Sequence, residues 1–138
     1  MGQIERSLAT LRLFGDDLIP EEISAVLGAS PSDSYRKGDQ EIGKVTGKIR
    51  IQKTGSWRLC AEAREPEDLN AQILEILTKL SLDLNVWKSL SSRYEVNFFC
   101  GLFMASSNDG LLLSVDTLQA LAVRGIKIGL DIYSPTEE

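Results

Sequence analysis

The sequence contains no histidine, and this absence excludes several kinds of chemistry. Without an imidazole there is no Ser-His-Asp triad, no Cys-His pair, no histidine metal ligand and no histidine pH switch. The only cysteines, Cys60 and Cys100, are too few for a structural zinc site, which takes about four ligands. Neither the GxGxxG pattern nor the P-loop pattern occurs. The sequence therefore predicts no metal site and no cofactor, and it marks no catalytic residue.

Long apolar runs are missing as well. No stretch approaches the ~20 apolar residues that a membrane helix requires. The N-terminal segment lacks the basic region and apolar run of a signal peptide, so we expect a cytoplasmic protein that does not contact a membrane. The length of 138 residues, 43% of them hydrophobic, is typical of one domain over 1–138 with a frayed tail at 135–138.

Hydrophobic periodicity predicts both helices and strands. Residues 7–14 alternate, with Ala9, Leu11 and Leu13 on one face of a strand. Pro20 favours the first turn of a short helix that ends at Gly28. The other predicted elements are strands at 34–37, 44–53 and 56–63, a long helix at 69–87, strands at 94–104 and 111–113, a helix from 115 to 124 and a strand at 126–133.

The resulting order is βαβββ-α-ββαβ. Alternating strands favour an α+β domain with a mostly antiparallel (mixed) sheet, one wetter face and helices packed on the other face. The strand at 94–104 is apolar at nearly every position, which indicates a central strand. The long helix carries a single apolar stripe that allows a break near 81–85.

A basic hairpin is the most distinctive feature. The turn Thr54-Gly55 is predicted to join strands 44–53 and 56–63, with Val45, Ile49, Ile51, Trp57 and Leu59 facing inward. Residues 44–64 carry six cations and one anion, in a chain of net charge −5. Five of these cations share the outward parity and are expected to line one exposed face: Lys44, Lys48, Arg50, Arg58 and Arg64.

The same parity separates the two cysteines. Cys60 falls with the polar residues of its strand, and Cys100 falls with the apolar residues of its own. Alternate residues of a strand face opposite sides of the sheet, so no disulfide is expected. We predict an exposed free thiol at Cys60 and a core residue at Cys100.

Several short motifs resemble a known family. They are Leu13-Phe14-Gly15, Ile19 to Ile23, Leu27-Gly28, Tyr35 to Asp39, Gly55-Ser56-Trp57, the long helix after Glu65, Leu121 to Gly125 and Leu130 to Tyr133. Together they resemble an uncharacterised bacterial family, domain of unknown function 4279. The resemblance implies a single α+β domain of bacterial origin, and it supplies no activity and no site residues.

The favoured functional hypothesis is a non-enzymatic binding module. Its basic sheet face would meet an acidic protein partner or a second copy of the chain, and the ligand is not identified. Outward Phe14, Phe99 and Phe103 would add apolar contacts. The candidate binding residues are Lys48, Arg50, Arg58 and Arg64 on the hairpin, with Tyr35 and Arg36 in a segment suited to holding an anion.

Two other functions are considered. A small enzyme would use carboxylates, tyrosine, lysine or Cys60 in a pocket that the sequence does not reveal. Nucleic-acid binding is disfavoured, because the chain is acidic overall and carries no RNA-recognition signature.

Overall fold

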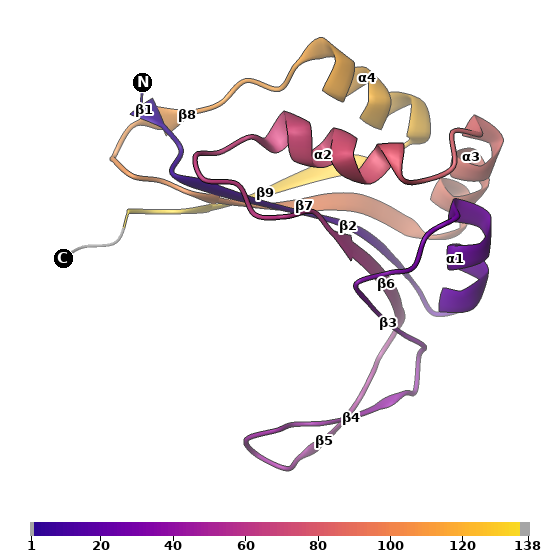
Figure 1. The fold of residues 1–138 in the computed structure, drawn as a ribbon. Helices are drawn as coiled ribbons and strands as arrows, with labels where there is room; N and C mark the ends of the chain where they lie inside the picture. The colour runs from indigo at the N-terminus through magenta and orange to yellow at the C-terminus, as the bar shows by residue number, and fades with distance from the viewer. Residues whose placement is uncertain (1, 136–138) are drawn as a thin grey trace.

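The computed structural model describes residues 2–135, and Figure 1 shows the arrangement of its elements. The helices are α1 (Pro20–Leu27), α2 (Leu69–Thr78), α3 (Leu84–Arg93) and α4 (Val115–Arg124). The strands are β1 (Gly2–Gln3), β2 (Arg6–Gly15), β3 (Asp33–Tyr35), β4 (Gln40–Ile42), β5 (Ile49–Ile51), β6 (Gly55–Cys60), β7 (Glu95–Phe103), β8 (Asp109–Gly110) and β9 (Lys127–Tyr133). Residues 136–138 of the predicted frayed tail lie outside the described residues.

The main sheet has five strands in the order β3-β6-β2-β7-β9. Three of its four pairings are antiparallel, and β9 runs parallel to β7. The helices lie on one face of this sheet (Figure 1). The predicted α+β domain with a mixed, mostly antiparallel sheet and helices on one face is therefore confirmed.

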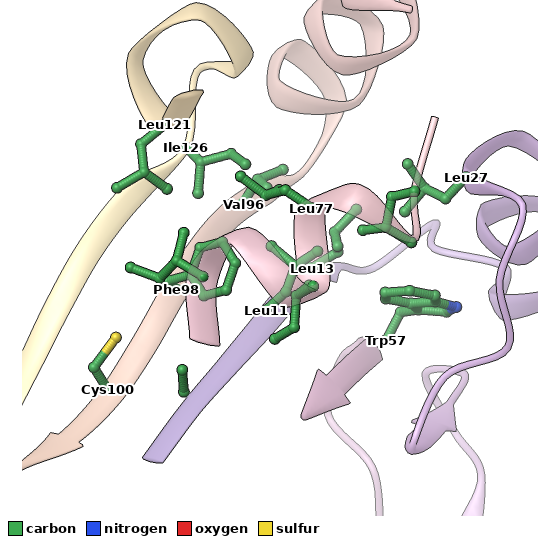
Figure 2. Packing of buried hydrophobic residues seen from close by; sticks show 14 of the residues in the cluster. Leu11, Leu13, Leu27, Trp57, Leu77, Val96, Phe98, Cys100, Leu121 and Ile126 are labelled. Carbon is green, nitrogen blue, oxygen red and sulfur yellow. The ribbon is translucent and has the colours of Figure 1, made fainter. Parts of the chain in front are cut away.

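The alternation of β2 and its neighbours creates the core. Leu11 and Leu13 of β2, Trp57 of β6 and Phe98 of β7 are fully buried beneath the helices. Figure 2 shows these side chains packed against residues of α1, α2 and α4. β7 lies between β2 and β9, as predicted for a strand that is apolar on both faces.

Side-chain caps begin two of the helices, and a glycine ends another. Asp68 accepts a hydrogen bond from the Ala71 amide at the start of α2, and Ser114 caps α4. Gly28 has a φ of 80° after α1, a left-handed conformation that favours glycine. The predicted boundaries of α1 and α4 are confirmed.

The predicted basic hairpin is wrong. β5 pairs with β4, whereas β6 pairs with β2 and β3 in the main sheet. β4 itself lies in the segment 38–43, between two predicted strands, where the sequence analysis placed no strand. β4 and β5 form an arm that projects from the sheet (Figure 1), and Val45 and Ile49 are 98% and 62% exposed on it. Alternating residues are buried only where another layer covers one face of the strands, and a two-stranded arm has no such layer.

Other predictions need smaller corrections. The long helix at 69–87 is two helices, because Asp83 caps a new helix, α3, after the break at 79–83. No strand forms at 111–113 in the described structure, where β8 at Asp109–Gly110 pairs with β1. Leu118 of α4 lies in the predicted apolar stripe but is 48% exposed.

The first prediction tests the packing of α2 on the sheet. Ile73→Ala is expected to lower the free energy of unfolding by about 2–5 kcal/mol, because Ile73 is fully buried and its truncation leaves a cavity. Leu82→Ala is the control, since Leu82 is exposed between α2 and α3. Chemical denaturation measures both, and equal losses would contradict this assignment of the core.

Candidate functional site

The face of the sheet opposite the helices is open (Figure 1). The register places one residue from each strand in rows across this face. One row contains Asp33, Arg58, Arg12, Asn97 and Lys127, from β3 to β9. This row contains three cations and one anion, its Lys127 is ion-paired with Glu95, and Arg12 of β2 lies at its centre next to Arg58.

Aromatic rings flank the two arginines of this row. The Arg12 guanidinium lies 4.5 Å from the ring centre of Phe99 and 5.1 Å from that of Phe14. Arg58 lies over the same Phe14 ring at 5.5 Å. Cation–π contact of this kind orients a guanidinium without neutralising its charge. Phe14 thus holds two cations beside each other.

The two arginines have acidic neighbours but no direct ion pair, because Asp33 lies only in register with Arg58 and Glu95 acts on Arg12 only through its charge. Across the described residues, neither Arg12 nor Arg58 forms an ion pair. Arg12 Nε donates a hydrogen bond to Asn97 Oδ1 at 2.9 Å, which is a neutral acceptor. Partial burial, and then the positive charge of Arg58, lower the pKa of Arg12, and the negative charge of Glu95 only partly opposes them.

Two polar atoms next to this pair are buried without a partner in the described structure. They are Nε of Arg58 and Oγ of Ser56, on alternate positions of β6. Ser56 is fully buried, so its hydroxyl does not reach a ligand on the open face. We define the arginine site as Arg12, Arg58, Phe14 and Phe99. Its donors and cations suit a carboxylate or another anion.

The structure disperses the predicted basic stripe. Lys48 and Arg50 lie on the exposed β4–β5 arm, and Arg50 is in register with Glu41. Arg58 alone of the four hairpin candidates lies on the open face of the main sheet. Residues 44–64 therefore do not form one surface, because the chain changes from one sheet to another between β5 and β6.

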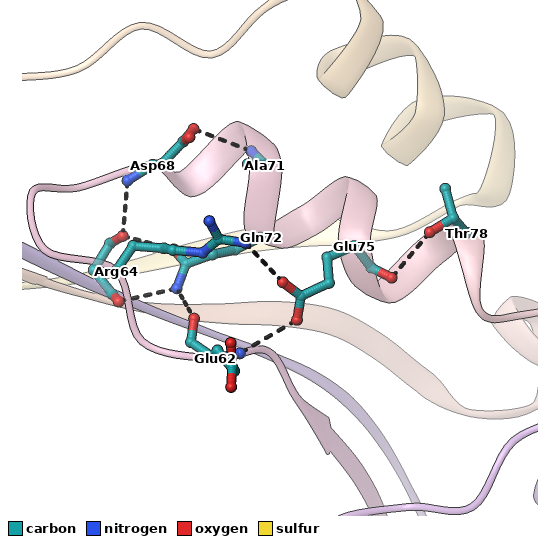
Figure 3. Close-up of polar contacts among 8 residues, drawn as sticks. Glu62, Arg64, Asp68, Ala71, Gln72, Glu75 and Thr78 are labelled. Carbon is teal, nitrogen blue, oxygen red and sulfur yellow. Dashed lines mark hydrogen bonds and ion pairs between the residues drawn. The ribbon is translucent and has the colours of Figure 1, made fainter.

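Arg64 has a structural partner (Figure 3). Its Nη2 lies 2.9 Å from Glu75 Oε1 of α2, and this hydrogen bond is the main reason that the pKa of Glu75 is lowered. Backbone bonds between Arg64 and Ser7 tie the same segment to β2. Arg64 thus joins α2 to the end of the sheet, away from the arginine site.

Tyr35 and Arg36 make contacts with different parts of the structure. Tyr35 lies in β3, in register with Ser56, whereas Arg36 forms an ion pair with Glu21 of α1 at 3.1 Å. A hollow of about 410 Å³ beside Tyr35 is lined in part by the carboxylates of Asp33, Asp39 and Glu41. The structure does not bring Arg36 and Tyr35 together around this hollow.

The residues proposed for an enzyme are scattered over the surface. Cys60 is exposed and accepts a contact from the Thr10 hydroxyl at 3.5 Å. Asp16 forms an ion pair with Lys37. Within residues 2–135, no group of three carboxylate or cysteine side chains is placed to hold a metal ion, and no helix is long and apolar enough to cross a membrane.

A separate cavity of about 520 Å³ lies between α1 and α3. Its walls are mainly apolar and include Ile23, Val26, Val86 and Leu90. Glu22, Asp83 and Arg93 also line it. The cavity lies away from the open face and holds none of the candidate residues that the sequence suggests.

The sequence analysis missed Arg12, the central residue of the site. In the sequence Arg12 stands among apolar residues of the strand 7–14, far from the basic block. The alternation of this strand does indicate that the Arg12 side chain lies on the face opposite Leu11 and Leu13. Its neighbour Arg58 is 46 positions away, and only the β2–β6 register brings them opposite each other.

A buried polar contact beside Arg64 leads to the second prediction. Gln72 of α2 is fully buried, and its Nε2 donates hydrogen bonds to the carbonyl oxygens of Ser7 and Glu62 at 3.0 and 2.8 Å. Gln72→Leu removes the donor to the Glu62 carbonyl and the acceptor of the Ser7 hydroxyl, whereas the Ser7 carbonyl keeps the Arg64 amide. The free energy of unfolding is therefore expected to fall by about 1–3 kcal/mol. Gln119→Leu, on the exposed face of α4, is the control for thermal or chemical unfolding. Equal stability of the two variants would show that the contact contributes little.

The third prediction concerns the two thiols, which face opposite sides as the sequence analysis expected. Cys60 is exposed and Cys100 is buried, and burial raises the pKa of the Cys100 thiol to about 12. Because the thiolate is the reactive form, an alkylating reagent should label Cys60 in the native protein and Cys100 only after unfolding. Peptide mass mapping after a brief reaction measures this, and native labelling of Cys100 would contradict the burial.

The comparisons with known proteins place the chain in a family. No curated protein and no solved structure matches it. The model of one family, described as Domain of unknown function (DUF4279), matches residues 4–135, which is nearly the whole chain. The chain therefore belongs to the DUF4279 family, as its motifs suggested.

Proposed function

We propose that the protein is a non-enzymatic binding module whose open sheet face binds an acidic segment of a protein partner. The observation that carries this proposal is the pair Arg12 and Arg58, which lie directly opposite each other on adjacent strands and form no ion pair with the described residues. Like charges at such positions are mutually destabilising. A carboxylate between them would remove the repulsion and accept charge-assisted hydrogen bonds.

The surroundings favour a peptide carboxylate within a larger contact. Phe14 and Phe99 hold the guanidinium groups in place, which lowers the entropy lost on binding. Phe99 is 37% exposed and offers an apolar surface beside the charges. Aromatic and arginine residues together are typical of the centre of a protein interface.

The setting of this module is part of the same proposal. A bacterial source is supported by the resemblance from which the family was first inferred. A cytoplasmic location is supported by the two free thiols, because a reducing compartment keeps such residues unpaired.

The fourth prediction tests the arginine site with a fluorescein-labelled oligoglutamate peptide. Its anisotropy should rise with protein concentration at low ionic strength, although the protein carries a net charge of −5. Arg12→Gln and Arg58→Gln are each expected to raise the Kd about tenfold, because each removes a charge-assisted hydrogen bond. Added salt should weaken binding to the parent protein.

Arg36→Gln is the matched control, since it also removes one arginine charge but lies at an ion pair with Glu21. Its Kd should stay close to that of the parent. Thermal unfolding of all three variants checks that the fold is retained. Absence of peptide binding at low salt, or an equal loss in the control, would overturn the proposal.

A further inference from the structure

The two edges of the main sheet differ in length. β3, at one edge, has three residues, whereas β9, at the other, has seven. Among the described residues, β9 pairs only with β7, so its other side has unpaired backbone groups. A long exposed edge is a template for another strand, and proteins normally cover or shorten it.

The backbone of β9 shows which residues face outward. The Tyr133 carbonyl accepts a hydrogen bond from the Met104 amide at 3.1 Å, so it is directed toward β7. Because the direction alternates along a strand, the amides and carbonyls of Ile128, Leu130 and Ile132 face the open edge. Leu130 and Ile132 are also 45% and 58% exposed, although their side chains lie on the helix side of the sheet.

We propose that β9 pairs antiparallel with β9 of a second copy of the chain, about a twofold axis at Gly129. In this register Lys127 of each copy faces Asp131 of the other, which gives two opposite-charge pairs on the open face. On the helix side, Ile128 of each copy faces Leu130 of the other.

Three observations favour a second copy over an unrelated strand. The register that matches Lys127 with Asp131 is the same one that matches Ile128 with Leu130, so charge and apolar contacts agree. The outward amides of Ile128 and Leu130 then form a hydrogen-bonded pair. Gly129 lies on the axis and brings no side chain into contact with its own copy.

The charges on β9 also have suitable neighbours. Lys127 lies 3.1 Å from Glu95 Oε1 of β7, and Asp131 accepts a hydrogen bond from the Tyr133 hydroxyl at 2.6 Å. Glu95 belongs to β7, and the Tyr133 ring stacks on Phe103 of β7 at 4.7 Å, so both contacts are made toward β7. The proposed pairing would extend the open face across two copies, and it does not depend on the arginine site.

The fifth prediction tests this dimer and its register. Light scattering on the parent protein should show a mass twice the 15.2 kDa of the chain, falling on dilution. In a Cys60→Ser background, Gly129→Cys should form a disulfide-linked dimer on mild oxidation. In the proposed register, residue 129 of one copy and residue 129 of the other form a non-hydrogen-bonded pair. Their Cα atoms would then lie ~4.5 Å apart, within reach of a disulfide. A Cβ at position 129 meets only the Phe98 carbonyl oxygen, at 3.8 Å, so the cysteine fits.

Ser107→Cys in the same background is the control, because Ser107 is exposed on the turn between β7 and β8 and is not part of β9. A charge exchange provides a second measurement. Lys127→Asp or Asp131→Lys alone should raise the dimer Kd about tenfold, since each creates two like-charge pairs, and the double variant should restore dimerisation.

A monomer at the highest soluble concentration would overturn the proposal. Cross-linking through Leu130→Cys in preference to Gly129→Cys would overturn the register, and failure of the double variant to recover would overturn the charge pairing. Unfolding curves of each variant show whether a loss of dimer merely reflects a loss of fold. The oligoglutamate experiment is read separately, because Arg12 and Arg58 take no part in the β9 pairing.

Discussion

The alternation of β2 is the constraint on which the rest of the molecule depends. β2 lies between β6 and β7 and is in register with both. One side of it carries Leu11 and Leu13, which the helices bury, and the other carries Arg12 and Phe14. A shift of one residue would exchange these faces, exposing the leucines and burying a charge. The same alternation therefore positions both the core and the arginine site.

The end of this sheet is secured by polar contacts. After β6 stops, the chain returns to β2 through the bonds between Ser7 and Arg64. Gln72 donates hydrogen bonds to the Ser7 and Glu62 carbonyl oxygens at this junction, and Glu75 pairs with Arg64 (Figure 3). The buried side-chain amide of Gln72 is stabilising here, because backbone groups at the end of the sheet need hydrogen-bond partners. α2 is thereby fixed to the sheet by specific contacts as well as by its apolar stripe.

Prediction from the sequence succeeded where local pattern and burial agree. Residues 7–14 alternate against a real core, and Gly28 and Gly125 end helices for a local backbone reason. It failed at Val45 and Ile49, where the same alternation occurs on an arm with nothing to cover it. The hairpin error has the same origin, because a turn signal at Thr54-Gly55 does not reveal that β6 pairs with β2.

The candidate site illustrates a more general limit. A block of charge along the sequence becomes a surface only if its residues share a sheet, and residues 44–64 divide between the arm, the open face and the contact with α2. Cross-strand neighbours such as Arg12 and Arg58 come from distant parts of the chain, so no local count of charge finds them. The alternation in the sequence does indicate that each of these arginines faces outward on its own strand. Parity predicts the face on which a side chain lies, and register alone decides which charges meet there.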